Sequence, residues 1–100
     1  MDSFTVVVSC DPDTGVYTAF CPAMPGAIAE ASSHEAVLRA VADVMGGWLE
    51  AGLRDGYVPR EETPSLVSVA LAETLEDRQA EGWDLSVETT IVAPAVLTAA

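Results

Sequence analysis

Runs of β-branched and apolar residues, separated by turn formers, dominate the first third of the chain. Residues 4–9 (FTVVVS) have the composition of a strand, and residues 11–15 (DPDTG) combine Pro and Gly in a pattern typical of a tight turn. Residues 16–21 (VYTAFC) have strand propensity again and end at Pro22, which cannot donate a hydrogen bond to a ladder. The pattern therefore predicts a β-hairpin, and residues 27–30 (AIAE) are a candidate for a short third strand.

A long amphipathic helix is predicted next. Its apolar residues recur at steps of three and four, which places on one face Val37, Leu38, Val41, Val44, Met45, Trp48, Leu49 and Leu53. Ser33 is a good N-cap, whereas a cap at Ser32 would place Glu35 at the spacing of a capping box. We expect the helix to end near residues 54–56, and the pair Gly46-Gly47 inside it to mark a close packing contact.

The second half of the chain predicts one more helix and a returning strand. Residues 57–64 form a polar linker with two prolines, and residues 65–81 keep apolar positions at helical spacing. Residues 66–69 (LVSV) alone also have the pattern of a strand. Residues 85–92 alternate as in a strand with one apolar face, which Pro94 ends.

The element order is therefore β-β-β-α-α-β. We expect residues 1–94 to form a single α+β domain, with a small antiparallel sheet of about four strands covered on one face by helices. Val41, Met45 and Trp48 of the first helix would face the sheet. Residues 95–100 are expected to form a flexible C-terminal tail.

Charge narrows the classes of function. The 100 residues include 4 Lys+Arg and 16 Asp+Glu, a net charge of −12, and the four arginines are scattered, so we expect no direct nucleic-acid binding. Such an acidic chain suits solubility or steered association with a basic partner. The first residues (MDSF) lack the positive charge of a secretion signal, and no apolar run approaches the roughly 18 residues of a membrane span. We therefore expect a cytoplasmic protein without membrane contact.

Candidate catalytic chemistry is sparse. His34 is the one histidine of the chain, and it lies in the predicted first turn of the long helix, where we expect a solvated or capping role. Cys10 and Cys21 are expected on strands as inert thiols. Pairing of Cys10 near Val16 would keep the two thiols roughly 16 Å apart along the hairpin, too far for a disulfide. We expect no enzymatic activity, no cofactor and no metal site.

The segment of residues 22–26 (PAMPG) is more specific than these general patterns, because of the elements on either side of it. In this context the chain resembles the HicB family of antitoxins over about residues 3–59. In that family a strand of the type F-x-V-x-V, a turn and an aromatic strand lead into P-x-L-P-G, and a helix then starts at Thr or Ser followed by Glu. The matching positions are Phe4 to Val8, Asp11 to Gly15, Tyr17, Pro22, Met24, Pro25, Gly26, Ser33, Glu35, Leu38, Trp48, Leu49, Glu50 and Pro59.

The chain also departs from the family pattern. Ala31 stands where a glycine is usual, and Ala36 where a second acidic residue is usual. Many family members carry a helix-turn-helix or ribbon-helix-helix domain after this module, whereas residues 63–100 contain one basic residue, Arg78. DNA-binding autoregulation is therefore not expected.

The resemblance implies a partial RNase H-like fold without a working set of catalytic carboxylates. It also implies a partner, a small basic HicA-like toxin that cleaves mRNA, which the antitoxin neutralises by stoichiometric occlusion. As partner contacts we nominate the loop of residues 22–26 and exposed acidic residues of the two helices: Asp43, Glu50, Glu73, Glu76 and Asp77.

Two other functions fit the sequence less closely. The chain could be a HicB-like self-associating module without a toxin partner, pairing through a valine-rich edge at residues 5–9 or 87–92. A homodimer is our expectation for the oligomeric state. A nuclease would need several carboxylates at strand ends to hold magnesium, and the predicted strands offer Glu30 and Glu88.

Overall fold

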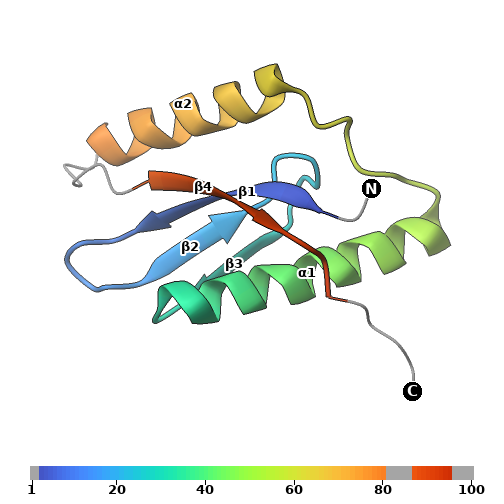
Figure 1. Ribbon diagram of the computed structural model, residues 1–100, viewed down its shortest axis with the longest axis horizontal. Helices are drawn as coiled ribbons and strands as arrows, with labels where there is room; N and C mark the ends of the chain where they lie inside the picture. Colours follow the sequence, from blue (N-terminus) through green and yellow to red (C-terminus); the bar gives the residue numbers. More distant parts are fainter. Residues whose placement is uncertain (1–2, 81–86, 96–100) are drawn as a thin grey trace.

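The computed structural model describes residues 3–80 and 87–95. Its elements follow the predicted order: β1 (Phe4–Cys10), β2 (Tyr17–Phe20), β3 (Ile28–Ala31), α1 (His34–Asp55), α2 (Pro64–Ala80) and β4 (Val87–Val92). The strands form one antiparallel sheet in the spatial order β3-β2-β1-β4 (Figure 1). The prediction of an α+β fold built on a four-stranded antiparallel sheet is therefore confirmed.

The β1–β2 hairpin closes through the turn that the sequence predicts. The Asp11 amide donates to the Val16 carbonyl at 2.9 Å, and the Gly15 amide donates to the Asp11 carbonyl at 2.8 Å. Gly15 has a φ of 73°, which glycine adopts without a steric penalty. The register pairs Cys10 with Tyr17, one residue from the predicted Val16, and Cys10 and Cys21 are not joined to each other by a disulfide.

Capping residues fix both ends of α1. The Ser33 side chain accepts a hydrogen bond from the Ala36 amide at 3.1 Å, so Ser33 is the N-cap of the two candidate serines. At the other end the Gly56 amide donates to the Gly52 carbonyl at 2.8 Å, and Gly56 has a φ of 83°. A glycine in this left-handed conformation is a common helix stop, and it lies within the predicted end of the helix.

The hydrophobic core lies between α1 and one face of the sheet. Alternate strand residues and one stripe of α1 meet in a single buried cluster, whose larger members are Phe4, Val6, Val8, Met24, Val37, Val41, Met45 and Val92. Side chains of this size contribute about 1.5–3 kcal/mol each on full burial. We therefore infer that this α1–sheet contact supplies most of the stability of the domain.

Helix α2 lies on the opposite face of the sheet. It contacts β1 and β4, whereas α1 contacts β2 and β3, and Figure 1 shows the two helices on opposite sides of the strands. Here the structure differs from the expected arrangement, which placed the helices on one face. The reason lies in β1, which is buried on both faces: Val7 points away from α1, is 1% exposed and pairs with Phe20.

The edges of the sheet are β3 and β4. Strand β1 pairs with β2 from Val7 and with β4 along its length from Phe4 to Ser9. The expectation that residues 5–9 form a free edge is therefore wrong. A strand with a nearly continuous apolar run is buried on both faces, and such strands lie inside a sheet. Of the two candidate edges, only residues 87–92 lie at the side of the sheet.

The linker between the helices is tied to the strand layer. The Arg60 amide donates to the Ala23 carbonyl at 2.7 Å. The Glu62 carboxylate accepts from the Thr5 amide, which lies beyond the residues of β1 that pair with β2. These two bonds guide the chain from the end of α1 to the face that α2 covers.

Several predicted boundaries fall outside the described residues, namely Glu81, residues 85–86 and residues 96–100. Residues 66–69, for which a strand was the alternative, lie within α2. Ala95, the first residue of the predicted tail, donates its amide to the Ala42 carbonyl of α1 at 3.0 Å. After β4 the chain therefore lies against α1 at Ala95, the last residue that the structure describes.

Two glycines of α1 provide a matched test of the packing. A Cβ added at Gly52 would lie 2.5 Å from the Tyr57 carbonyl oxygen, whereas a Cβ at Gly47 would meet nothing within 4 Å. The structure thus shows a close contact at Gly52, which was not predicted, and open space at Gly47; Gly46, the other glycine of the predicted contact, is buried. We expect Gly52→Ala to lower the free energy of unfolding by about 1–3 kcal/mol through overpacking.

Gly47→Ala serves as the control for this substitution. Alanine is the better helix former and the site has room, so this variant should raise the free energy of unfolding by roughly 0.5–1 kcal/mol. Urea denaturation followed by circular dichroism measures both changes. Equal effects of the two substitutions would contradict the packing described around Tyr57.

Candidate functional site

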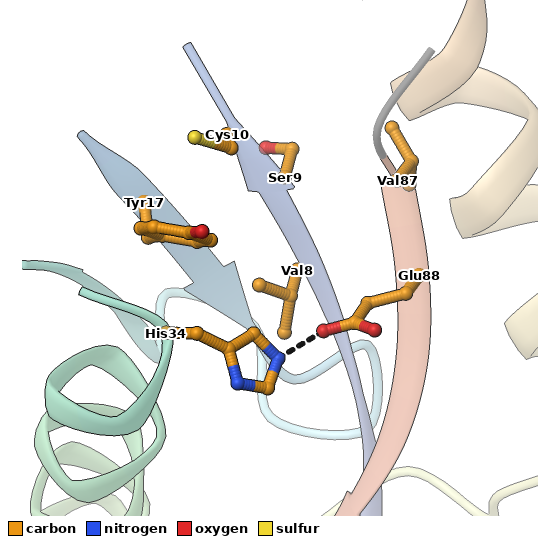
Figure 2. Close-up of a pocket in the computed structure, with 7 residues that line it drawn as sticks. All are labelled: Val8, Ser9, Cys10, Tyr17, His34, Val87 and Glu88. Atoms are coloured by element: carbon orange, nitrogen blue, oxygen red, sulfur yellow. Dashed lines mark hydrogen bonds and ion pairs between the residues drawn. The ribbon is translucent and has the colours of Figure 1, made fainter. Parts of the chain in front are cut away.

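One candidate site is a hollow of about 350 Å³ at the end of the sheet where α1 begins. It is lined by Val8, Ser9, Cys10, Tyr17, His34, Val87 and Glu88 (Figure 2). His34 comes from the first turn of α1 and Glu88 from β4, and their side chains form an ion pair that passes over β1. The Tyr17 ring contacts the His34 imidazole edge to face, with centroids 5.8 Å apart.

The contact between His34 and Glu88 indicates a structural role for the two side chains. His34 Nε2 bonds to the Glu88 carboxylate, and both side chains are about half exposed. Exposed ion pairs contribute little free energy, typically under about 1 kcal/mol. The contact nevertheless ties the start of α1 to an edge strand 54 residues away, a link that no local sequence pattern could predict.

The 22–26 segment forms a compact turn joined to α1. Pro22, Ala23 and Met24 are buried, whereas Pro25 and Gly26 are exposed. The Ala27 amide donates to the Met24 carbonyl at 2.9 Å. The buried half of the segment therefore belongs to the core, and the exposed half faces outward.

Trp48 holds this segment in place. Its indole Nε1 donates to the Pro25 carbonyl at 3.0 Å, and its ring contacts Tyr57 edge to face with centroids 4.8 Å apart. Gly26 has a φ of 90°, a conformation that favours glycine. The proline, glycine and tryptophan of the sequence motif thus act together to shape one turn.

Cys21 is buried beside this turn. Burial raises the pKa of its thiol, and the backbone amides of Ala23 and Met24 oppose that shift by hydrogen bonding. A buried thiol with a raised pKa is a poor nucleophile, because the thiolate is the reactive form. This agrees with the expected inert role of Cys21.

A second candidate site is a groove between α2 and the strands β2 and β3, which we call the α2 groove. Two adjoining hollows of about 400 and 290 Å³ form it, and they share Phe20, Ile28, Ala70 and Glu73. Its apolar lining includes two strongly exposed side chains, Ile28 at 54% and Val69 at 56%. Exposed apolar side chains gathered at one groove are typical of an interaction surface.

The structure separates the nominated acidic residues into two groups. Glu73 and Asp77 line the α2 groove, and Glu76 is exposed on the same helix. Asp43 and Glu50 are exposed on α1, and α1 lies on the other face of the sheet. The five nominated residues are therefore divided between two surfaces of the domain.

The described residues contain no metal centre and no membrane helix. No group of three or more His, Cys, Asp or Glu side chains among them could hold a metal ion. No helix in the same part of the chain is long and apolar enough to cross a membrane.

The comparisons with known proteins concern the fold. No protein-family model matches the sequence, and no curated protein matches it. Among solved structures, the chain is similar to the N-terminal domain of the antitoxin HicB from Burkholderia pseudomallei, with a TM-score of 0.60 and 20% sequence identity. The match covers 94% of this chain and 99% of that domain. The chain therefore shares the fold of a HicB N-terminal domain.

This likeness bears out the resemblance that the sequence motif indicates. It extends beyond residues 3–59, because 94% of the chain is covered. The match therefore also includes most of the chain after residue 59, which the resemblance in sequence did not cover.

Proposed function

We propose that the chain is an antitoxin-like protein that binds a small basic HicA-type mRNA interferase and neutralises it by stoichiometric occlusion. The observation that carries the proposal is the likeness in fold to a HicB N-terminal domain over 94% of the chain. The net charge of −12 supports it, since an acidic surface steers a basic enzyme and competes with RNA for its cleft. A cytoplasmic location, where mRNA is translated, is part of the proposal.

Binding without catalysis is part of the same proposal. A nuclease would need Glu30 and Glu88 near one magnesium ion. Glu88 of β4 lies opposite Val8 of β1 in the sheet, so its side chain is on the same face as Val8, which faces α1. Glu30 lies between Ala29 and Ala31 in β3, and because both alanines pack on the α1 side, the side chain of Glu30 points to the other face. The two carboxylates therefore point to opposite faces of the sheet, which argues against a nuclease.

Capture from the native cells tests the antitoxin function. A tagged copy should retain a small basic protein that cleaves mRNA, and one equivalent of the chain should abolish the cleavage. Because opposite charges drive association, the Kd should weaken roughly tenfold between 0.1 and 0.5 M salt.

The control is an unrelated acidic protein of similar charge, which should not inhibit the cleavage at one equivalent. Two results would contradict the proposal. One is cleavage that persists with excess chain present, and the other is the absence of any RNA-cleaving partner from cells that express the neighbouring genes.

A second candidate function is self-association through β4. This edge strand (VETTIV) is rich in β-branched residues and carries one charge, so little opposes pairing with another strand. Antiparallel pairing of two copies centred on Thr90 would place Glu88 opposite Val92 and Thr90 opposite its own copy. No like charges would then oppose each other, and we propose a homodimer joined in this way.

A lysine at the edge tests this dimer. Ile91 is 65% exposed, and Ile91→Lys should convert the dimer to a 10.4 kDa monomer in light scattering after gel filtration. Leu53→Lys is the matched control, because Leu53 is 90% exposed and lies on α1, so this variant should stay dimeric. A monomeric parent protein, or an Ile91→Lys variant that stays dimeric, would overturn the proposal.

A further inference from the structure

The two helices cover the two faces of the sheet unequally. Helix α2 contacts β1 and β4, and the α2 groove lies where β2 and β3 continue beyond it. On this face β2 contributes Thr18 and Phe20, and β3 contributes Ile28 and Glu30, which pair with them in register. Two strands of the sheet therefore have a partly open face beside α2.

The width of this open strip matches one helix. Neighbouring strands lie about 4.8 Å apart, so two strands span roughly 10 Å. An α-helix with its side chains is about 10–12 Å across, and packed helices lie about 8–10 Å apart. A single helix laid beside α2 would therefore cover both strands and contact α2 as well.

The apolar residues of α2 also point to an absent neighbour. Val69 is 56% exposed and lines the groove, while Thr74 is the one buried side chain among those described for α2. Leu66 and Ala70 line the same groove and are half-buried. Helix α2 thus has apolar side chains on a side that the sheet of this chain does not cover.

The charges around the groove define the chemistry of its occupant. Glu73 and Asp77 lie one turn apart on α2 and line one wall. Glu30 lies on β3, on the same face of the sheet as Ile28 and so on the other side of the strip. The apolar floor of Phe20 and Ile28 therefore has Glu73 and Asp77 along the α2 wall and Glu30 nearby on β3. Arg60 lines the groove at the end formed by Pro22 and Pro25, so the net charge around the groove is negative.

We propose that the α2 groove is the docking site for an amphipathic helix of the basic partner. The apolar stripe of that helix would pack on Phe20, Ile28 and Val69. Lysine or arginine side chains on its two flanks would pair with Glu30 on one side and with Glu73 and Asp77 on the other. This inference rests on the proposed binding of a basic protein and names the surface that binds it.

A designed peptide provides the first test. The probe is a helical peptide of about 14 residues, or four turns, with leucine on one face and lysine on both flanks. Its binding should shift the amide NMR signals of Ile28, Val69 and Glu73 and leave those of Asp43 and Glu50 in place. A scrambled peptide of the same composition should bind at least about tenfold more weakly, because it lacks the apolar stripe.

Two pairs of substitutions distinguish binding in the α2 groove from a general effect of the negative charge of the protein. Glu73→Gln with Asp77→Asn should weaken peptide binding at least about tenfold, since two charge pairs are lost. Asp43→Asn with Glu50→Gln removes the same charge from α1 and should leave the Kd within twofold. Ile28→Ser, at an exposed site, should also weaken binding. Equal losses for the two charge pairs, or signal shifts confined to α1, would overturn the proposal.

The same variants distinguish failure of this inference from failure of the proposed function. If the RNA-cleaving partner is neutralised equally well by the Glu73→Gln, Asp77→Asn variant, the groove is not its docking site and the antitoxin function stands. If the peptide binds in the groove and no RNA-cleaving partner exists, the groove is supported as a helix-binding site and the antitoxin function is contradicted. Shifts at Ile28 and Val69 on concentrating the protein alone would show that a second copy fills the groove, and would overturn the proposal.

Discussion

Val37, Val41 and Met45 recur along one stripe of α1 and are fully buried against the sheet, and the other features of the fold depend on this contact. Because α1 packs on one face and α2 on the other, the linker carries the chain from one face to the other. The Arg60–Ala23 and Glu62–Thr5 bonds tie the linker to the strand layer on the way to α2. Helix α2 then covers β1 and β4, which leaves the face of β2 and β3 beside it partly open.

This unequal coverage links the fold to its proposed function. A sheet covered fully on both faces would offer a partner only its loops and edges. Here the open strip combines exposed apolar side chains, Ile28 and Val69, with the carboxylates Glu73 and Asp77. Burial of the apolar side chains would contribute binding affinity, and the carboxylates would raise the association rate and the specificity for a basic partner. One surface therefore combines the properties that a protein needs to capture a basic enzyme.

Local signals in the sequence predicted much of this structure. Ser33 marks the start of α1, the DPDTG turn closes the hairpin, and the PAMPG segment indicates the HicB-like fold. Features that depend on long-range packing could not be predicted. The His34–Glu88 pair joins residues 54 apart, and the place of β1 between two strands follows from where β4 returns. The acidic candidates were chosen by charge and exposure alone, so Asp43 and Glu50 could not be separated from Glu73 and Asp77.

Native-state hydrogen exchange measures the unequal coverage directly. The amides of β1 and of the centre of α1 should exchange only through global unfolding, because they border the main core. The amides of α2 should exchange through a partial opening, with protection at least about tenfold lower, since α2 has one buried side chain among those described. Protection of α2 equal to that of Val41 and Met45 in α1 would contradict the account, because both helices would then be held to the sheet equally well.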